Sequence, residues 1–168
     1  MNNAQLINQD SGDYEYYTQA FIIEAARRTM GRIDLDPACS HDAILRVKAL
    51  YYYSEYGLER GWFGNVWLNH PFSREFNKQW IHKLVDSYQL GYITQACCIC
   101  YASTSEGWFQ PLFQYMQCWL SPRTNYLLPD GSLKRGVTKG SVVTYLGNNK
   151  QGFYDNFSVY GKVTVPYV

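Results

Sequence analysis

The sequence has no strong excess of charge, no long apolar run and no even set of cysteines, and each absence excludes a class of protein. The 168-residue chain has a formal net charge of +1 at pH 7, so any binding to nucleic acid has to rest on a local basic patch. No apolar stretch is long enough to span a bilayer, and the polar N-terminus lacks the apolar segment of a signal peptide. We therefore expect a cytosolic protein with no membrane partner.

The five cysteines are an odd number, which argues against a disulfide framework in a cytosolic chain. Cys97, Cys98 and Cys100 fall in one short apolar run that is typical of a buried strand. Neighbouring residues of a strand point to opposite faces, and no second Cys/His pair lies at the spacing of a zinc finger. We expect buried core thiols and no metal site.

Aromatic residues are abundant, with 16 Tyr, 8 Phe and 5 Trp. Most should pack in the core, although such rings can also stack on a flat ligand. The chain is 46% hydrophobic and 17% charged, which is typical of a folded globular protein. Its length predicts a single compact domain over residues 13–168 that follows a loose N-terminus over residues 1–12.

Hydrophobic periodicity and turn residues predict helices and strands that alternate early in the chain, with more strands late. Helices are predicted over 19–30, from 40 or 41 to 50, and over 73–88, 106–115 and 153–160; strands are predicted over 33–36, 65–68, 92–101, 118–120, 124–128, 141–146 and 162–168. Thr18 is the predicted N-cap of the first helix and Gly31 its C-cap. This order predicts an α/β fold whose sheet is mostly parallel with an antiparallel edge.

Asn69-His70-Pro71-Phe72 directly follows an apolar run and is the most informative motif of the chain. Ligands of parallel sheets bind at the carboxyl ends of the strands, where this motif places an amide, a bent backbone and an aromatic ring. A nucleobase suits this set, since it can stack on Phe72 while its exocyclic amine donates to the Asn69 oxygen and to a loop carbonyl. Asn-x-Pro is also common turn chemistry, so the tetrapeptide alone does not distinguish a turn from an active site.

Asp34 and Asp36 alternate with Leu35 on the predicted strand that Pro37 ends, so both carboxylates should lie on one face. Carboxylates at such a position can accept hydrogen bonds from ribose hydroxyls or pair with an ammonium group. The alternative is that they cap the next helix. We favour ligand binding for Asp36 more strongly than for Asp34.

Basic residues in two places are candidates for contacts with nucleic acid phosphates. The first group flanks the predicted hairpin over 129–140, and the second follows Phe72. They are Arg123, Lys134, Arg135 and Lys139 in the first group, and Arg74 and Lys78 in the second. A solvated hairpin tip with ordinary surface charges is the alternative interpretation.

Several short motifs occur in one order along the chain. They are Tyr16-Tyr17-Thr18, Gly31-x-Ile33-Asp34-Leu35-Asp36-Pro37-Ala38, Val47-Lys48-Ala49, Gly57-Leu58, Trp62-x-Gly64-x-Val66-Trp67-Leu68-Asn69 and Trp108-Phe109. Together they resemble the phage-type DNA N6-adenine methyltransferases, the Dam-like family of small phage and prophage enzymes. The resemblance implies a Rossmann-like methyltransferase fold, S-adenosylmethionine as methyl donor, DNA as substrate and the host cytoplasm as location.

The resemblance also implies roles for individual residues. The donor pocket would be lined by Asp34, Asp36, Pro37 and Ala38, with Tyr17 and Thr18 near the methionine end, and the target adenine would be held by Asn69, His70, Pro71 and Phe72. The chain departs from the usual motifs at Gln19, Ile44, Tyr56 and His70, where His70 replaces the first proline of Asn/Asp-Pro-Pro-aromatic. Methylation of cytosine N4 or of RNA, a non-catalytic descendant that binds nucleic acid or a nucleotide, and a homodimeric state remain open alternatives.

Overall fold

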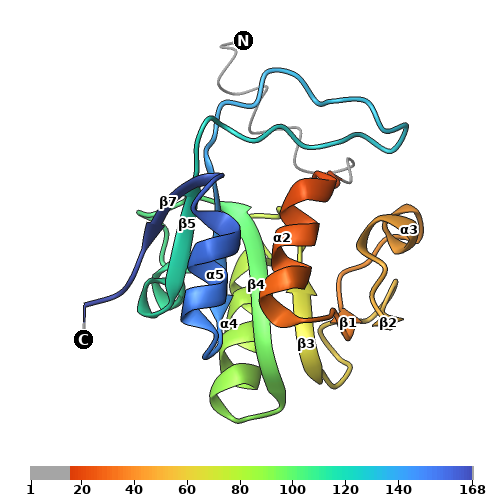
Figure 1. Ribbon diagram of the computed structural model, residues 1–168. Helices are drawn as coiled ribbons and strands as arrows, with labels where there is room; N and C mark the ends of the chain where they lie inside the picture. Colours follow the sequence, from red (N-terminus) through yellow and green to blue (C-terminus); the bar gives the residue numbers. More distant parts are fainter. Residues whose placement is uncertain (1–15, 168) are drawn as a thin grey trace.

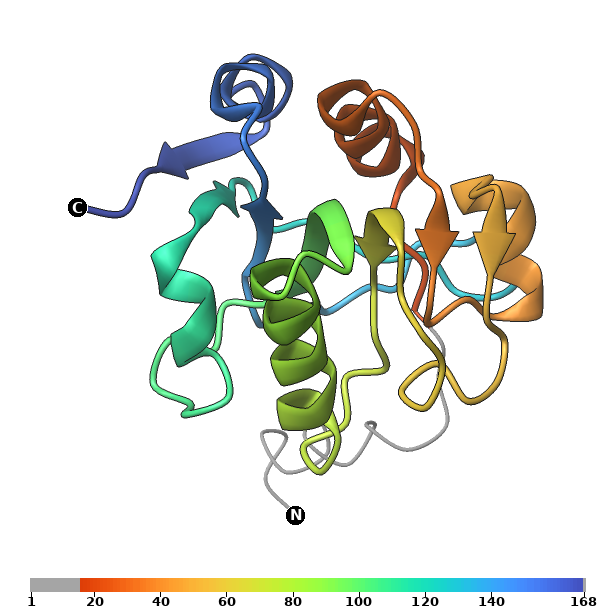
Figure 2. The ribbon, with the colours of Figure 1, turned by 90° about the horizontal axis from the view of Figure 1, so that it is seen from below.

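The structure, a computed structural model, describes residues 16–167. The predicted loose N-terminus, residues 1–12, lies outside these described residues, as do the first residues of the predicted domain. The described part forms an α/β domain in which helices cover both faces of one seven-stranded sheet (Figures 1 and 2). Within residues 16–167, no helix combines the length and the apolar character needed to cross a membrane.

The helices and strands largely follow the predicted order along the chain. They are α2 (Ala20–Met30), β1 (Leu35–Asp36), the 3-10 helix η1 (His41–Ala43), α3 (Ile44–Val47), β2 (Tyr51–Tyr52), β3 (Gly64–Leu68), α4 (Asn77–Gln89), β4 (Ile93–Tyr101), the 3-10 helix η2 (Gln110–Gln114), β5 (Met116–Leu120), β6 (Ser141–Leu146), α5 (Lys150–Phe157) and β7 (Gly161–Thr164). Gly31 ends α2 with a φ of 82°, which confirms the predicted C-cap. The predicted N-cap is wrong, because Gln19 occupies that position and the Thr18 hydroxyl makes no hydrogen bond with any residue from 16 to 167.

Three predicted elements differ from the structure. The helix expected to reach residue 50 ends at Val47, because Lys48 adopts a left-handed conformation (φ 51°) and β2 begins soon afterwards. The helix expected over 106–115 is only the 3-10 helix η2, since Pro111 lacks the amide hydrogen that a longer α-helix needs there. The strand expected over 124–128 is reduced to isolated bridges of Leu127 with Tyr17 and Leu133.

The strands are arranged in the order β2-β1-β3-β4-β6-β5-β7. The first four are parallel to one another, whereas β6 is antiparallel to both of its neighbours and β7 is antiparallel to β5. The expected antiparallel edge is therefore present as β7, but a second antiparallel strand, β6, lies inside the sheet. It does so because the segment 121–140 folds back from β5, so that consecutive strands pair in antiparallel fashion.

Two cores lie on opposite faces of the sheet. Figure 2 shows α2 and α5 on one face, with α4 and η2 on the other. The alternation of side chains along β4 places Cys97 in the core beneath α2 and α5, whereas Cys98 and Cys100 belong to the core beneath α4. The expected burial of the cysteines is confirmed. Among residues 16–167, no group of three or more His, Cys, Asp or Glu residues is arranged to hold a metal ion.

The carboxyl ends of the parallel strands form the edge of the sheet that carries the predicted site. The segment 121–140 crosses this edge, at the top of Figure 1. It is tied to the start of the described chain by two backbone hydrogen bonds between Tyr17 and Leu127, of 2.9 and 2.8 Å, and by the Gln19 side chain, which donates to the Asn125 carbonyl at 2.7 Å. Residues from the start of the described chain and from the segment 121–140 therefore meet at the carboxyl ends of the parallel strands.

Candidate functional site

Asn69 follows directly on β3, and its side chain has a defined orientation. The Asn69 Nδ2 atom donates to the Tyr16 carbonyl at 3.0 Å. No residue between 16 and 167 donates a hydrogen bond to Asn69 Oδ1. The amide is thus held by its nitrogen, which leaves its oxygen available to accept a hydrogen bond from a ligand.

Phe72 stands in an aromatic wall that only the folded chain brings together. Its ring centroid lies 4.5 Å from that of Tyr101 at the end of β4, and 5.6 Å from that of Tyr126 in the crossing segment. Phe72 and Tyr101 line a cavity of about 570 Å³, a volume within the range of small-molecule sites. The lining comprises Tyr16, Phe72, Arg74, Asn77, Tyr101, Ser103, Glu106, Trp108, Lys134, Arg135, Gly136, Val137, Thr138 and Lys139. We call this cavity the aromatic pocket.

Four of the six predicted phosphate-binding residues line the aromatic pocket. They are Arg74, Lys134, Arg135 and Lys139, and they face one acidic residue in the lining, Glu106. Two of these cations also lie over aromatic rings. The Lys134 ammonium lies 4.2 Å from the Tyr16 ring centroid and donates to the Tyr16 hydroxyl, and that of Lys139 lies 5.5 Å from the Tyr101 centroid. The other two predicted residues, Lys78 and Arg123, are exposed and do not belong to this lining.

His70 lies beneath the loop and not in the aromatic pocket. Only 1% of the residue is exposed, and its ring centroid is 6.4 Å from those of Trp80 and Trp108. The Nε2 atom lies 3.0 Å from Asn77 Oδ1, and the ring also interacts with the buried Cys98 thiol. The loop that begins at Asn69 is therefore anchored from below by a buried imidazole.

Asp36 ends β1, is 3% exposed and accepts a hydrogen bond from the Ala38 amide at 3.2 Å. Burial raises the pKa of Asp36 to about 7, although hydrogen bonds from Ala38 and Cys39 act in the opposite direction. The adjoining turn at Pro37 is supported by Gly57, where a Cβ atom would overlap the Pro37 carbonyl oxygen. This close backbone contact explains the glycine of the Gly57-Leu58 pair.

Asp34 has a different environment from Asp36. It precedes β1, pairs with the Arg32 guanidinium at 2.7 Å, and accepts a hydrogen bond from the Asn65 amide at 2.8 Å. A Cβ atom at Gly64 would collide with the Asp34 side chain, so the carboxylate is packed closely against the start of β3. These partners join two strands, and they give Asp34 a structural role in the described part of the chain.

The segment 16–18 links the two predicted halves of the site. The Tyr16 carbonyl accepts from Asn69, and the Tyr17 hydroxyl accepts from Ser40 Oγ at 3.1 Å in the turn that follows Pro37. Thr18 is 3% exposed, and its hydroxyl has no hydrogen-bond partner among the described residues. The structure therefore brings the predicted donor-binding residues Tyr17 and Asp36 to the same edge of the sheet as Asn69.

The sequence interpretation did not predict Tyr101, Trp108, Tyr126 and Asn77 as site residues. Tyr101 ends a predicted parallel strand, which is a signal that could have identified it. Trp108 belonged to the ordered motifs, but no role was assigned to it. Nothing local in the sequence marks Tyr126 or Asn77, because their positions depend on the crossing segment and on the start of α4.

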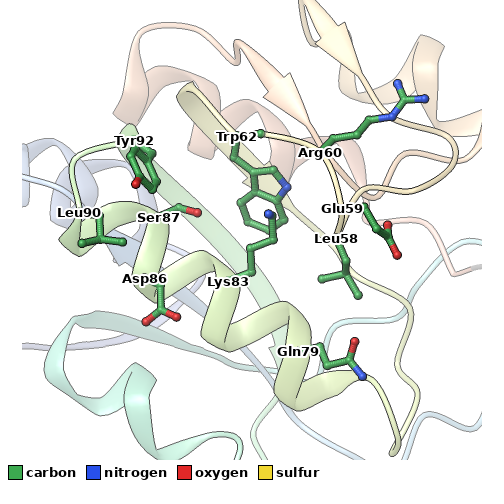
Figure 3. Close-up of a pocket in the computed structure, with 11 residues that line it drawn as sticks. Leu58, Glu59, Arg60, Trp62, Gln79, Lys83, Asp86, Ser87, Leu90 and Tyr92 are labelled. Atoms are coloured by element: carbon green, nitrogen blue, oxygen red, sulfur yellow. The ribbon is translucent and has the colours of Figure 1, made fainter.

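A second cavity, of about 670 Å³, lies on the other flank of α4 (Figure 3). Its lining comprises Leu58, Glu59, Arg60, Gly61, Trp62, Gln79, Lys83, Asp86, Ser87, Leu90 and Tyr92. The Lys83 ammonium lies 5.6 Å from the Trp62 ring centroid, and the indole nitrogen donates to the Gly57 carbonyl at 2.8 Å. None of the predicted site residues lines this groove, and its two cations are balanced by two carboxylates.

Comparisons of the chain with family models, with curated proteins and with solved structures found no match. The function is therefore inferred from the geometry at the carboxyl edge of the sheet. That edge combines an oriented amide, an aromatic pocket with a cationic rim and a buried carboxyl group.

Proposed function

We propose that this protein is a Rossmann-like methyltransferase that transfers a methyl group from S-adenosylmethionine to N6 of adenine in DNA. The observation that carries the proposal is the orientation of Asn69, whose hydrogen-bond partner Tyr16 lines the aromatic pocket. Tyr16 holds the amide nitrogen and also lines the pocket, so the amide oxygen remains to accept from an exocyclic amine. Phe72 offers a ring in the same loop on which the base can stack.

The donor set at the end of β1 fits the polar groups of S-adenosylmethionine. Asp36 is a buried carboxyl with few internal partners, and Thr18 carries a buried hydroxyl with no hydrogen-bond partner among residues 16–167. Buried polar groups normally have partners, so these atoms are suited to a ligand with hydroxyl and ammonium groups. The donor supplies a methyl group activated on a sulfonium. Asp36, Pro37 and Ala38 would hold it, with Tyr17 and Thr18 alongside.

The loop residues can align the amine and stabilise the charge that develops on it. As the amine nitrogen forms its bond to the methyl carbon, the carbon–sulfur bond of the donor would break, and its electron pair would stay on sulfur to give the neutral thioether S-adenosylhomocysteine. The nitrogen becomes positively charged, and its extra proton then leaves to solvent. The Asn69 oxygen accepts one amine hydrogen in this state. The Pro71 carbonyl already accepts from the Ser73 amide at 2.8 Å, so the His70 carbonyl is the better second acceptor. Alignment by these two acceptors supplies much of the rate enhancement.

The cationic rim supports DNA as the substrate. Arg74, Lys134, Arg135 and Lys139 surround the aromatic pocket, which suits phosphates on either side of a base that stacks on Phe72. Because the whole chain has a net charge of only +1, attraction of phosphates would depend on this local cluster of cations.

The first test is calorimetric titration of S-adenosylmethionine into the purified protein, with S-adenosylhomocysteine for comparison. We expect micromolar binding of both. Transfer of a labelled methyl group to oligonucleotides should then require adenine and should not occur when every adenine is replaced by guanine. A folded protein that binds neither compound would overturn the proposal. Transfer to cytosine or to RNA alone would change the substrate while the donor assignment stands.

A further inference from the structure

Asn77 is a polar residue of the aromatic pocket that the proposed mechanism does not use. It begins α4, is half-buried, and lies in the lining beside Phe72, Arg74 and Trp108. Its Oδ1 atom faces the His70 Nε2 atom at 3.0 Å. No described residue accepts a hydrogen bond from its Nδ2 atom, so this nitrogen can serve a ligand in the pocket.

The buried His70 imidazole determines that the oxygen of the Asn77 amide, and not its nitrogen, forms the hydrogen bond within the protein. An amide oxygen only accepts, so a hydrogen bond with His70 requires a hydrogen on Nε2, and the neutral ring then carries its lone pair on Nδ1. The ring is held in this position by Trp80, Trp108 and Phe72, whose centroids lie 6.4, 6.4 and 5.7 Å away. Because Oδ1 is directed at His70, Nδ2 with its two N–H donors is the end of the Asn77 amide that is left for the pocket.

We propose that Asn77 reads the target base, by donating a hydrogen bond from Nδ2 to one of the two adenine ring nitrogens that flank the amino group, N1 or N7. The inference rests on the proposed function of the same site. An amide whose oxygen is directed at His70 presents its nitrogen to the base, which complements the ring acceptors of adenine next to its amine, while the Asn69 oxygen receives the amine itself. His70 acts as a positioning residue, since it orients Asn77 without touching the base.

This arrangement gives the histidine of the Asn-His-Pro-Phe loop a specific purpose. A proline at position 70 would constrain the backbone but would provide no partner for Asn77. The histidine keeps the carbonyl of the loop and adds a buried donor that fixes the neighbouring amide. Residues that do not touch a ligand commonly orient, through hydrogen bonds of this kind, the side chains that do.

The test compares oligonucleotides that carry adenine, 1-deazaadenine or 7-deazaadenine at the methylated position. With the wild-type protein, we expect one of the two analogues to lower kcat/KM by about 10- to 100-fold, in keeping with one lost base contact. The Asn77→Ala variant should lose a similar factor on adenine and should no longer distinguish adenine from that analogue. Asn148→Ala, which changes an exposed asparagine outside the site, is the matched control and should behave as the wild type.

The role of His70 is tested by two substitutions in the same assay. His70→Gln keeps an N–H donor and should retain discrimination between adenine and the sensitive analogue, whereas His70→Phe removes the donor and should reduce it. Donor binding and melting temperature identify variants that fail to fold. Asn77→Asp replaces the amide by a carboxylate that only accepts hydrogen bonds, so it should also abolish the discrimination between adenine and the sensitive analogue. If each analogue lowers kcat/KM by the same factor in the wild type and in Asn77→Ala, the inference about Asn77 is overturned, while the proposed function stands. A wild-type protein with no transfer to adenine would overturn the proposed function, and this inference with it.

Discussion

The two edges of the sheet differ in how their buried polar groups are satisfied. At the amino edge, Asn65 Nδ2 and Gln95 Nε2 both donate to the Met30 carbonyl, at 3.1 and 3.0 Å, and the Tyr145 hydroxyl donates to Gln95 at 2.7 Å. Asp34 adds its bonds with Arg32 and the Asn65 amide. Each of these side chains has partners within the protein, and together they join α2, β1, β3, β4 and β6.

At the carboxyl edge, several polar atoms have few or no partners among the described residues. The Thr18 hydroxyl is buried without a hydrogen bond in the described part of the chain, and Asn69 Oδ1 accepts from none of its residues. Asp36 is buried with a raised pKa. Because an unsatisfied buried polar group costs about 1–3 kcal/mol, the first edge stabilises the fold, whereas the second carries polar groups that the proposed ligands would satisfy.

Substitution of one asparagine at each edge should show the largest difference. Asn69→Ala removes the proposed amine acceptor, so we expect kcat for methyl transfer to fall about 100- to 1,000-fold with little change in donor affinity. Asn65→Ala should instead lower the free energy of unfolding by about 1–3 kcal/mol and leave kcat nearly unchanged, because it leaves buried carbonyl and amide groups without partners. Activity assays and chemical denaturation distinguish the two. Full activity in Asn69→Ala would contradict the assignment of this residue.

Asp36 should make the free energy of unfolding depend on pH. The pKa of Asp36 is raised from 3.8 to about 7, so the folded state retains a proton that the unfolded chain releases near pH 4. This contribution to stability is complete below pH 3.8 and is lost as the pH rises to about 7, by at most about 4 kcal/mol. Asp36→Asn should therefore become more stable relative to the wild type over this range. Denaturation curves of the wild type and of Asp36→Asn, measured from pH 4 to pH 8, check this expectation.

The same titration should affect donor binding. If ionised Asp36 accepts hydrogen bonds from the donor, affinity should weaken as the pH falls below 7, by up to about tenfold per pH unit. Calorimetry at several pH values measures the effect, and Asp36→Asn should show weaker binding that no longer depends on pH in this range. An unchanged pH profile in Asp36→Asn would remove Asp36 from the donor site.

The cationic rim should affect DNA binding more than the groove on the other flank of α4. Simultaneous substitution of Lys134, Arg135 and Lys139 by Ala should weaken oligonucleotide binding about tenfold or more at low salt. The slope of log K against log salt concentration should become shallower by about 0.7–0.9 for each phosphate contact that is lost. Arg60→Ala combined with Lys83→Ala, in the groove of Figure 3, is the control and should have little effect. Equal losses in both variants would indicate non-specific attraction.

The smallest expected effect concerns a backbone position outside both edges. Tyr56 has a φ of 58° and is 66% exposed, so it adopts a left-handed conformation without burying its ring. Asparagine tolerates this conformation better than tyrosine. Tyr56→Asn should raise the free energy of unfolding by about 0.5–1 kcal/mol, as measured by denaturation, while an exposed tyrosine with ordinary φ, Tyr154→Asn, should give no gain.

Local patterns in the sequence predicted much of the fold. The apolar run before Asn69 became β3, the alternation along residues 93–101 became the two-sided β4, and Gly31 ended α2. The elements that were missed depend on non-local contacts. The two-residue strand β2 exists because Tyr51 and Tyr53 donate to the Asp34 and Asp36 carbonyls, and no periodicity marks so short an element.

The sequence by itself determined the alternation of helices and strands and the position of Asn69 at the end of a strand, because these depend on residues that are close together in the chain. Only the tertiary structure decided which polar groups are satisfied. Asp34 and Asp36 look alike in the sequence, yet one is bonded to Arg32 and the Asn65 amide, and the other is buried at the open edge. The partner that orients Asn69 lies 53 residues away, and the cations of the aromatic pocket come from positions 74 and 134–139. Hydrogen bonding and electrostatic attraction act through space, so their outcome is decided by the packing of distant segments.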